Sequence, residues 1–244
     1  MSERLEHTLN NRNVKHFCKN VTMASVDHPW AQVGECEWEL PNPSKADPNG
    51  VAGIGADLEP STLVAAYRRG LFPMRLGGRS GVLGWWSPDP RGVMPIRGFH
   101  ASRTLQRSRT RFNITLNQDF VGVMQGCGDE RRSHGWIDES FLTAYTAMHE
   151  LGLAHSVEVR TESGEMVGGL YGVRIEGLFA GESMFHRATD ASKVALWATC
   201  ELLELGGVEL FDVQWNTDHL HSLGAIDIGR DDYLRALRAA VRTS

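Results

Sequence analysis

The stretch from residue 153 to residue 216 constrains the fold of this chain more than any other. Its apolar runs are separated first by short turns and then by one helix-length segment that two glycines end. Strands joined by short turns form an antiparallel meander, whereas a helix between strands carries a crossover to a parallel neighbour. We therefore expect an α+β fold, in which helices flank a mixed sheet. The expected strands are 153–159, 166–175, 178–185 and 208–214, and the expected helix is 190–205.

Two local signals refine this central unit. Gly168, Gly169 and Gly172 lie inside the second expected strand. Glycine at such positions indicates a bulge, or the close approach of another backbone or a ligand. Asp190 is expected to be the N-cap of the helix, because Asp is among the favoured N-cap residues.

The length of 244 residues fits one large domain, or one large domain with a small partner. We place the boundary near Pro88, which gives a small N-terminal domain at 1–88 and a larger domain at 89–244. A polar, unpatterned tail over about 1–26 is expected to be mobile. The Gly-rich stretch at 76–84 is expected to be a flexible linker or a lid.

An aromatic pair precedes the proposed boundary. Trp85 and Trp86 are followed by Pro88 and Pro90, which stiffen the segment. Two interpretations are equally open: an aromatic surface held out for a ligand, or a core plug between two domains.

Sequence patterns and cysteine content indicate the cellular compartment in which the protein works. The sequence shows no pattern of a membrane span or a secretory signal. Cys18, Cys36, Cys127 and Cys200 are far apart and form no C-x-x-C pair, which argues against a zinc site and a disulfide framework. Free thiols fit a reducing compartment, so we expect a cytoplasmic protein.

The charge is unevenly distributed. A net charge of −5 argues against nucleic acid, yet six arginines lie between residues 91 and 111, and 92–118 contains no acid. A basic segment on an acidic protein indicates a localised anion-binding face. In a helix expected at 102–110, Arg103 and Arg107 would share one side. A solvated surface helix is the alternative.

Polar side chains stand where the last expected strand should be apolar. Asp212 and Gln214 are two residues apart and point to one face of that strand. A carboxylate beside an amide can orient an amine and accept its proton, and an Asp that caps the next turn is the alternative. Glu182 lies inside another apolar strand, where it either pairs with an arginine or captures an amino group.

Other chemistries find little support in the sequence. His219 and His221 are two residues apart in a segment that reads as helix or turn, and no H-E-x-x-H motif accompanies them. We therefore expect no metal. The G-x-S-x-G elbow of a serine hydrolase is also absent from the sequence.

Several motifs resemble one known family over about residues 48–237, and that family is the leucyl/phenylalanyl-tRNA–protein transferases. The resemblance implies that Leu, Phe or Met is moved from aminoacyl-tRNA to the N-terminal Arg or Lys of an acceptor protein, which marks that protein for N-end-rule degradation. It implies a C-terminal domain like the GCN5-related acetyltransferase fold, and no cofactor or metal. The motifs are WWSPDPR at 85–91, AHSVEV at 154–159, VGGLYGV at 167–173, GESMF at 181–185, ASK at 191–193 and SLGA at 222–225.

The same resemblance assigns roles to individual residues. Catalysis falls on Asp212 and Gln214. Met74 stands where members of the family carry Trp, and Met can still line an apolar pocket. The aminoacyl-adenosine pocket falls on Tyr67, Met74, Trp136, Tyr145, Leu170, Phe179, Glu182 and Asn216, and tRNA binding falls on Arg97, Arg103, Arg107, Arg109 and Arg111.

An aminoacyl ester is already activated, so the enzyme needs mainly positioning and one proton acceptor. We expect Asp212 to polarise Gln214, whose side-chain oxygen draws a proton from the attacking amine. Two rivals remain. An acyl-CoA-dependent N-acetyltransferase would show a Gly-rich pyrophosphate loop, which 181–193 lacks. A non-catalytic RNA-binding module would use the arginines and the tryptophan pair.

Overall fold

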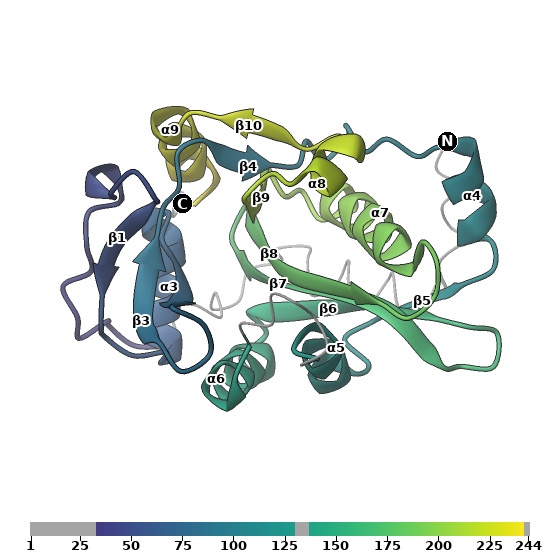
Figure 1. The fold of residues 1–244 in the computed structure, drawn as a ribbon, viewed down its shortest axis with the longest axis horizontal. Coiled ribbons are helices and arrows are strands. Elements are labelled where there is room, and N and C mark those ends of the chain that lie inside the picture. The colour runs from purple at the N-terminus through teal and green to yellow at the C-terminus, as the bar shows by residue number, and fades with distance from the viewer. Residues whose placement is uncertain (1–32, 130–136, 242–244) are drawn as a thin grey trace.

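The computed structural model describes residues 33–129 and 137–241, which form two sheets with flanking helices (Figure 1). The strands of the smaller sheet are β1 (Val51–Ile54), β2 (Phe72–Leu76) and β3 (Val82–Trp86). Those of the larger sheet are β4 (Arg91–Val93), β5 (Asn113–Leu116), β6 (Ala154–Arg160), β7 (Met166–Ile175), β8 (Leu178–His186), β9 (Leu210–Gln214) and β10 (Ile226–Ile228). The helices are η2 (Pro43–Lys45, a 3-10 helix), α3 (Pro60–Arg69), α4 (Arg103–Arg109), α5 (Phe120–Cys127), α6 (Glu139–Glu150), α7 (Ala191–Leu205), α8 (Asp218–Ser222) and α9 (Arg230–Ala240).

The sheets have the orders β1-β3-β2 and β10-β4-β9-β8-β7-β6-β5. Strands β6, β7 and β8 form the expected antiparallel meander, and α7 carries the chain to β9, which is parallel to β8. The expectation of a mixed α+β fold around this unit is therefore confirmed.

Pairing between β8 and β9 is short. It joins Leu178, Phe179 and Ala180 to Leu210, Phe211 and Asp212, and the register stops there. Strand β8 continues to His186, while β9 turns away toward β4, its other neighbour. We call the region beyond Ala180 and Asp212, where the two strands no longer pair, the β8–β9 split.

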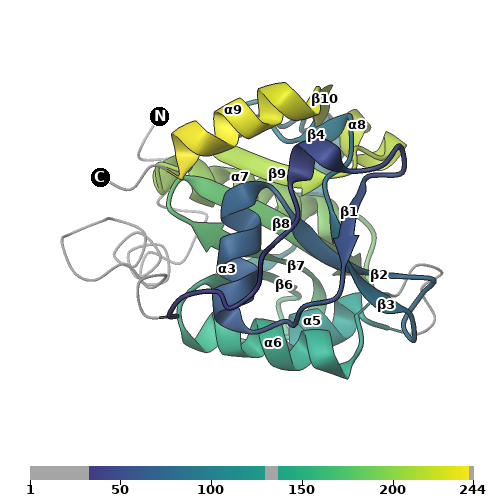
Figure 2. The ribbon, with the colours of Figure 1, turned by 90° about the vertical axis from the view of Figure 1, so that its left-hand side faces the viewer.

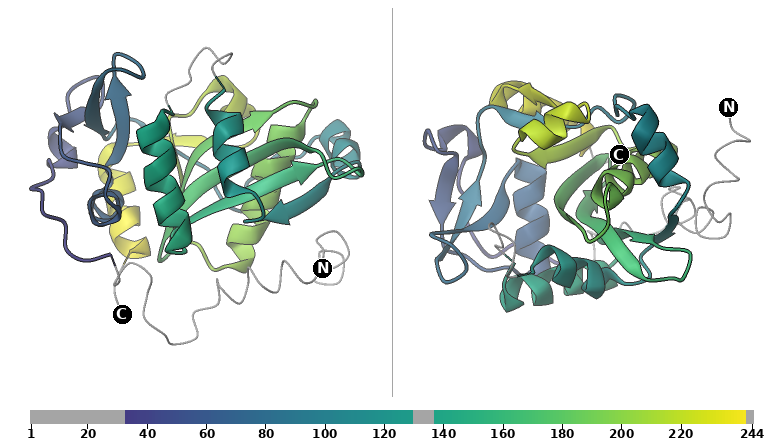
Figure 3. Two further views of the ribbon diagram at one scale, coloured as in Figure 1. Left: turned by 90° about the horizontal axis from the view of Figure 1, so that it is seen from below. Right: turned by 45° about the vertical axis from the view of Figure 1, so that its right-hand side comes forward.

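The helices cover both faces of the larger sheet (Figure 3). Helices α5 and α6 lie on one face, where they share a first core with α3 and α9. Helix α7 covers the opposite face with α4 and forms a second core. Figure 2 shows α3 standing between the smaller sheet and the larger one. No helix within residues 33–129 and 137–241 is long and apolar enough to cross a membrane.

Glycines in β7 have the expected consequences. The register of β7 against β8 shifts between Tyr171 and Gly172, which is a bulge. A Cβ added to Gly168 would lie 2.6 Å from the Cβ of Ala191, the first residue of α7. Both consequences predicted for glycine in this strand, a bulge and a close approach, are thus confirmed.

The Gly-rich stretch at 76–84 was wrongly expected to be a linker or lid. Most of it belongs to the hairpin of β2 and β3, in which Leu76 pairs with Val82. Gly77 and Gly78 have φ values of 79° and 90°, so these glycines shape the hairpin turn. Pro73 lies inside β2, and proline is uncommon in a paired strand, which weakens the local pattern of a strand.

The aromatic pair divides between the two interpretations. Trp85 is 1% exposed and its Nε1 donates to the Gly55 carbonyl at 2.9 Å, so it plugs the first core. Trp86 is half-buried, and its ring contacts Trp215 at 5.7 Å. Residues before and after Pro88 both contribute to the first core. The domain boundary that we placed near Pro88 therefore stays a prediction.

Asp190 holds the N-cap position of α7 but does not cap the helix with its side chain. Its carboxylate instead accepts from the Ser108 hydroxyl at 2.8 Å and pairs with the Lys193 ammonium at 3.0 Å. The residue has a left-handed backbone (φ 67°), which differs from the extended conformation of a capping residue.

Candidate active site

Asp212 is fully buried in β9 and holds four hydrogen bonds. Arg91 donates from Nε to Oδ1 at 2.9 Å and from Nη2 to Oδ2 at 2.6 Å. The Tyr233 hydroxyl donates to Oδ2 at 2.8 Å, and the Gln214 backbone N–H donates to Oδ1 at 2.9 Å. A bidentate pair with two further donors fixes the orientation of this carboxylate.

Arg91 reaches Asp212 because β4 pairs with β9 on the edge away from β8. Its guanidinium lies 4.8 Å from the Phe72 ring centre and 4.3 Å from that of Tyr233. Burial alone would lower the pKa of Arg91, but the Asp212 charge raises it overall, so the group stays cationic.

Sequence reasoning missed Arg91 and Tyr233. It counted Arg91 among the surface arginines, and that assignment was wrong because the side chain is 1% exposed and paired with Asp212. No local signal marked Arg91, because its inward position depends on the pairing of β4 with β9.

Gln214 is held in an unusual conformation beside Asp212. Its φ is 58°, in the left-handed region, and such strain in a residue other than glycine costs about 1–3 kcal/mol. Its side-chain Nε2 is buried and finds no hydrogen-bond partner among the described residues. A buried amide that lacks a partner is destabilising, which points to a ligand group at this position.

Asn216 belongs to the same turn after β9. Its Nδ2 donates to Asp227 Oδ2 at 3.2 Å and to the Ala225 carbonyl at 3.4 Å. Its Oδ1 is buried and without a partner in the part of the chain that the structure describes. One turn therefore supplies an unpaired amide donor and an unpaired amide acceptor.

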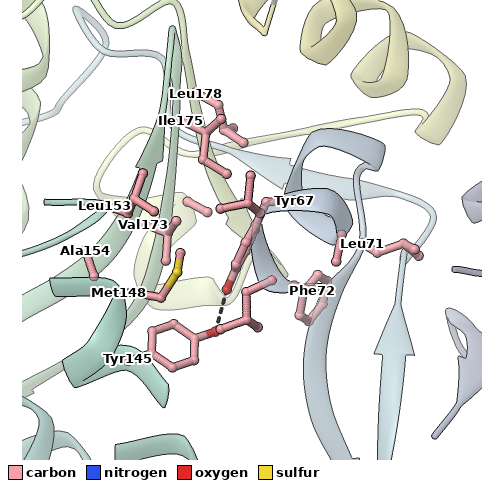
Figure 4. Close-up of a cluster of buried hydrophobic side chains, with 14 of the residues drawn as sticks. Tyr67, Leu71, Phe72, Tyr145, Met148, Leu153, Ala154, Val173, Ile175 and Leu178 are labelled. Carbon is pink, nitrogen blue, oxygen red and sulfur yellow. Dashed lines mark hydrogen bonds between the residues drawn. The ribbon is translucent and has the colours of Figure 1, made fainter. Parts of the chain in front are cut away.

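Glu182, on β8, forms a compact triangle with two tyrosines. The Tyr67 hydroxyl lies 2.7 Å from Glu182 Oε1, the Tyr145 hydroxyl lies 3.1 Å from Oε2, and the two hydroxyl oxygens are 2.5 Å apart. Figure 4 shows Tyr67 and Tyr145 meeting across the first core. Three contacts need three protons, and two tyrosines supply only two. A protonated Glu182 completes the triangle.

The pKa of Glu182 agrees with this count. Burial is the main cause that raises it to about 7, and the Asp212 charge acts in the same direction, while the tyrosine hydrogen bonds and Arg91 act in the opposite direction. The side chain nevertheless keeps part of its surface exposed. Glu182 is thus a carboxyl group that can change its charge near neutral pH and remain accessible.

The other residues predicted for the pocket do not all gather here. Leu170 and Phe179 lie in the second core, on the opposite face of the sheet from the tyrosines. Met74 is half-buried in β2 and pairs with Gly84. Trp136 lies outside the described residues, and the pocket roles of all these residues stay predictions.

The predicted tRNA-binding arginines also separate. Arg103, Arg107 and Arg111 are exposed on or just after α4. Arg109 turns inward, where it is 7% exposed and pairs with both carboxylate oxygens of Glu201, at 2.7 and 2.5 Å. Arg97 is exposed and pairs with Glu204 at 3.0 Å. The basic surface of α4 therefore consists of three of the five predicted residues.

The chemistry of this region rests on carboxylates, amides and phenols. Within the described residues, no group of three or more His, Cys, Asp or Glu side chains could hold a metal ion. A fixed carboxylate, an amide without a partner and a carboxyl group that titrates near neutrality suit the handling of an amine beside a carbonyl group.

Comparisons with known proteins give the family. The model of the leucyl/phenylalanyl-tRNA protein transferases matches residues 93–238, and the model of their N-terminal domain matches residues 56–89. A leucyl/phenylalanyl-tRNA–protein transferase of Edwardsiella ictaluri is 47% identical over 202 residues, which are 81% of this chain and 82% of the relative. One from Klebsiella pneumoniae is 46% identical over 199 residues, or 80% of this chain and 84% of the relative.

Among solved structures, a GCN5-related N-acetyltransferase from Kribbella flavida matches with a TM-score of 0.38 at 12% identity, over 67% of this chain and 58% of the other. The family assignment rests on the sequence matches alone. This chain belongs to the leucyl/phenylalanyl-tRNA–protein transferase family.

Proposed function

We propose that this protein moves Leu, Phe or Met from aminoacyl-tRNA to the N-terminal Arg or Lys of acceptor proteins in the cytoplasm, and so marks them for N-end-rule degradation. Family membership supports the reaction class. The observation that carries the proposal is the buried pair of Asp212 and Gln214 at the β8–β9 split, where the Gln214 amide lacks a partner among the described residues.

We propose that Asp212 contributes by positioning Gln214 and does not itself contact the reacting atoms. Arg91 and Tyr233 hold its carboxylate in place, and the hydrogen bond that it accepts from the Gln214 backbone N–H holds that residue in its left-handed conformation. The sequence had led us to expect that Asp212 polarises the Gln214 side chain. The hydrogen bond between them instead runs through the backbone, which leaves the side-chain amide for substrate.

The reaction then joins an amine to an ester carbon. A free α-amino group has a pKa near ~8, so part of it is neutral at pH 7. The side-chain oxygen of Gln214 accepts a hydrogen bond from this amine and draws its proton away as the nitrogen attacks. The new N–C bond forms, the ester C–O bond breaks, and the proton ends on the departing oxygen of the terminal ribose.

Glu182, Tyr67 and Tyr145 are proposed to receive the amino group of the aminoacyl substrate. The apolar residues of the pocket select the side chain weakly, because one methylene in such a pocket is worth about 1–3 kcal/mol. Leu, Phe and Met should therefore overlap as substrates, whereas charged side chains should be refused.

The direct test is transfer of labelled Leu from charged tRNA to a peptide that begins with Arg. We expect product with this peptide and none with the same peptide acetylated at its N-terminus, since the acetyl group removes the nucleophile. RNase treatment of the donor should abolish the reaction. If acetyl-CoA supports modification of the peptide and charged tRNA does not, the proposed function is wrong.

A further inference from the structure

A cavity lies away from the Asp212–Glu182 region and plays no part in the chemistry above. It has a volume of about 320 Å³, and we call it the His–Lys cavity after two of its side chains. Four of its lining residues carry or can carry positive charge. The lining residues are His186, Arg187, Ala188, Thr189, Asp190, Ser192, Lys193 and His219.

The cavity bridges the two sides of the β8–β9 split. His186 is the last residue of β8, four positions after Glu182, which corresponds to about 13 Å along an extended strand. His219 lies in α8, five positions after Gln214. A chain that leaves the candidate active site along the split therefore meets the His–Lys cavity next.

The basic side chains of the cavity lie close enough to interact. The pKa of His219 is lowered by burial first, and then by the nearby Lys193 and His186. The Ser192 hydroxyl lies 3.4 Å from His186 Nδ1. Such a gathering of cationic and donor groups is unfavourable by itself, and an anion would relieve it.

The acid among the lining residues, Asp190, is already engaged. Lys193 pairs with it at 3.0 Å, and the Ser108 hydroxyl of α4 donates to it at 2.8 Å. Arg111 in turn donates to the Ser108 oxygen at 2.9 Å. Asp190 therefore links the cavity to α4, which lies beside α7 (Figure 3). The Ser108–Asp190 hydrogen bond thus joins the cavity to α4, on which Arg103 and Arg107 are exposed.

We propose that the His–Lys cavity binds phosphate groups of the single-stranded 3′ end of the donor tRNA. The strand would pass from the basic surface of α4, through the cavity, to the split. This assignment rests on the proposed function, because it is the aminoacylated 3′ end that must reach Gln214. The class of ligand is a short single-stranded ribonucleotide, and recognition is by its backbone, with no reading of base sequence.

The test measures binding of uncharged tRNA, and of a short RNA that ends in CCA, to the full chain by fluorescence anisotropy at several salt concentrations. We expect the double variant Lys193→Gln/His219→Gln to raise Kd about tenfold. The slope of log K against log salt should fall by about 0.7 for each phosphate of the single strand that the variant no longer neutralises. Lys193→Arg, which keeps the charge, should bind like the wild type.

Lys45→Gln is the matched control, since Lys45 is an exposed cation in η2 and lies outside the cavity. Binding and salt slope should be unchanged in it. If the double variant matches this control in Kd and in slope, the cavity does not bind phosphate and the inference fails.

Steady-state transfer kinetics distinguish a specific loss of phosphate binding from a general loss of structure in the double variant. The double variant should lose about tenfold more kcat/KM with full-length aminoacyl-tRNA than with an aminoacyl-adenosine donor, which has no phosphate. Equal losses with both donors would overturn the inference. If the wild type transfers nothing while the binding difference persists, the proposed function falls and the phosphate site stands.

Discussion

Two carboxylates lie on the same side of the larger sheet, and their surroundings give them different properties. Asp212 is fully buried, accepts four hydrogen bonds and shares its charge with Arg91. Glu182 is partly exposed, lies within hydrogen-bond distance of the phenolic hydroxyls of two tyrosines, and has its pKa raised to about 7. The comparison indicates that Asp212 is an ion-pair partner of Arg91 that organises structure, whereas Glu182 changes charge near neutral pH.

The largest effect is expected from Asp212→Ala. Removing one partner of a buried ion pair leaves the Arg91 charge uncompensated and typically costs about 3–5 kcal/mol of stability. Transfer should also be nearly abolished, because Gln214 loses the acceptor for its backbone N–H. Urea unfolding and a Leu-transfer assay measure the two effects, and the variant should still bind tRNA at the surface of α4.

The double variant Asp212→Ala/Arg91→Met is the control for that prediction. It removes both charges, so it should recover much of the stability and none of the activity. If stability is not recovered, Asp212 matters to the fold for a reason other than its pairing with Arg91. If transfer survives in Asp212→Ala, the organising role assigned to Asp212 is wrong.

The next effect separates activity from stability at Gln214. Glycine adopts a φ of 58° without strain, so Gln214→Gly should unfold at the same or a higher urea concentration. Transfer should fall by about 100-fold, the size of effect seen when a hydrogen-bonding group at a reacting centre is removed. Gln214→Ala keeps the strain and should be the less stable of the two. Wild-type transfer in Gln214→Gly would leave no role for the side-chain amide.

The sequence predicted much of this region. Alternation and turn residues place β6 to β9 and α7 within a few residues, because each of these elements carries its own local pattern. Asp212, Gln214 and Glu182 were detectable as polar residues in apolar strands, where burial of a charge needs a partner.

The partners were not predictable in the same way. Arg91 is separated from Asp212 by 121 positions, and it faces inward only because β4 pairs with β9. Arg109 shows the same limit, since its partner Glu201 comes from α7. The spacing of the arginines predicts which of them share a helix face. Which of them are buried depends on the tertiary arrangement of elements that are distant in the sequence.

Glu182→Gln tests the proposed switch. The pKa of Glu182 is raised above the 4.5 of an ordinary Glu to about 7, so the folded state holds a proton that the unfolded state releases. The stabilisation from this group is complete below about pH 4.5 and is lost as the pH rises to about 7. Gln mimics the protonated acid and does not titrate, so the variant should gain in Tm relative to the wild type between pH 5 and pH 8.

Glu165→Gln serves as its control, because Glu165 is exposed in the turn before β7. The Tm difference between this control and the wild type should not change with pH. A pH-independent difference for Glu182→Gln as well would mean that Glu182 is ionised throughout, and the contrast with Asp212 would disappear.

The smallest effect on stability is expected when one tyrosine hydroxyl is removed beside each of the two carboxylates. Tyr233→Phe deletes one of four donors to Asp212 and should lower stability by about 1 kcal/mol, because the other three donors remain. Tyr145→Phe deletes a donor to Glu182, whose hydrogen bond holds the pKa of that group down. The pKa should then rise, and the pH range over which Tm falls should extend upward. Tm measured from pH 5 to pH 9 distinguishes the two variants, and the same pH profile in both would show that the Tyr145 hydrogen bond does not control the pKa of Glu182.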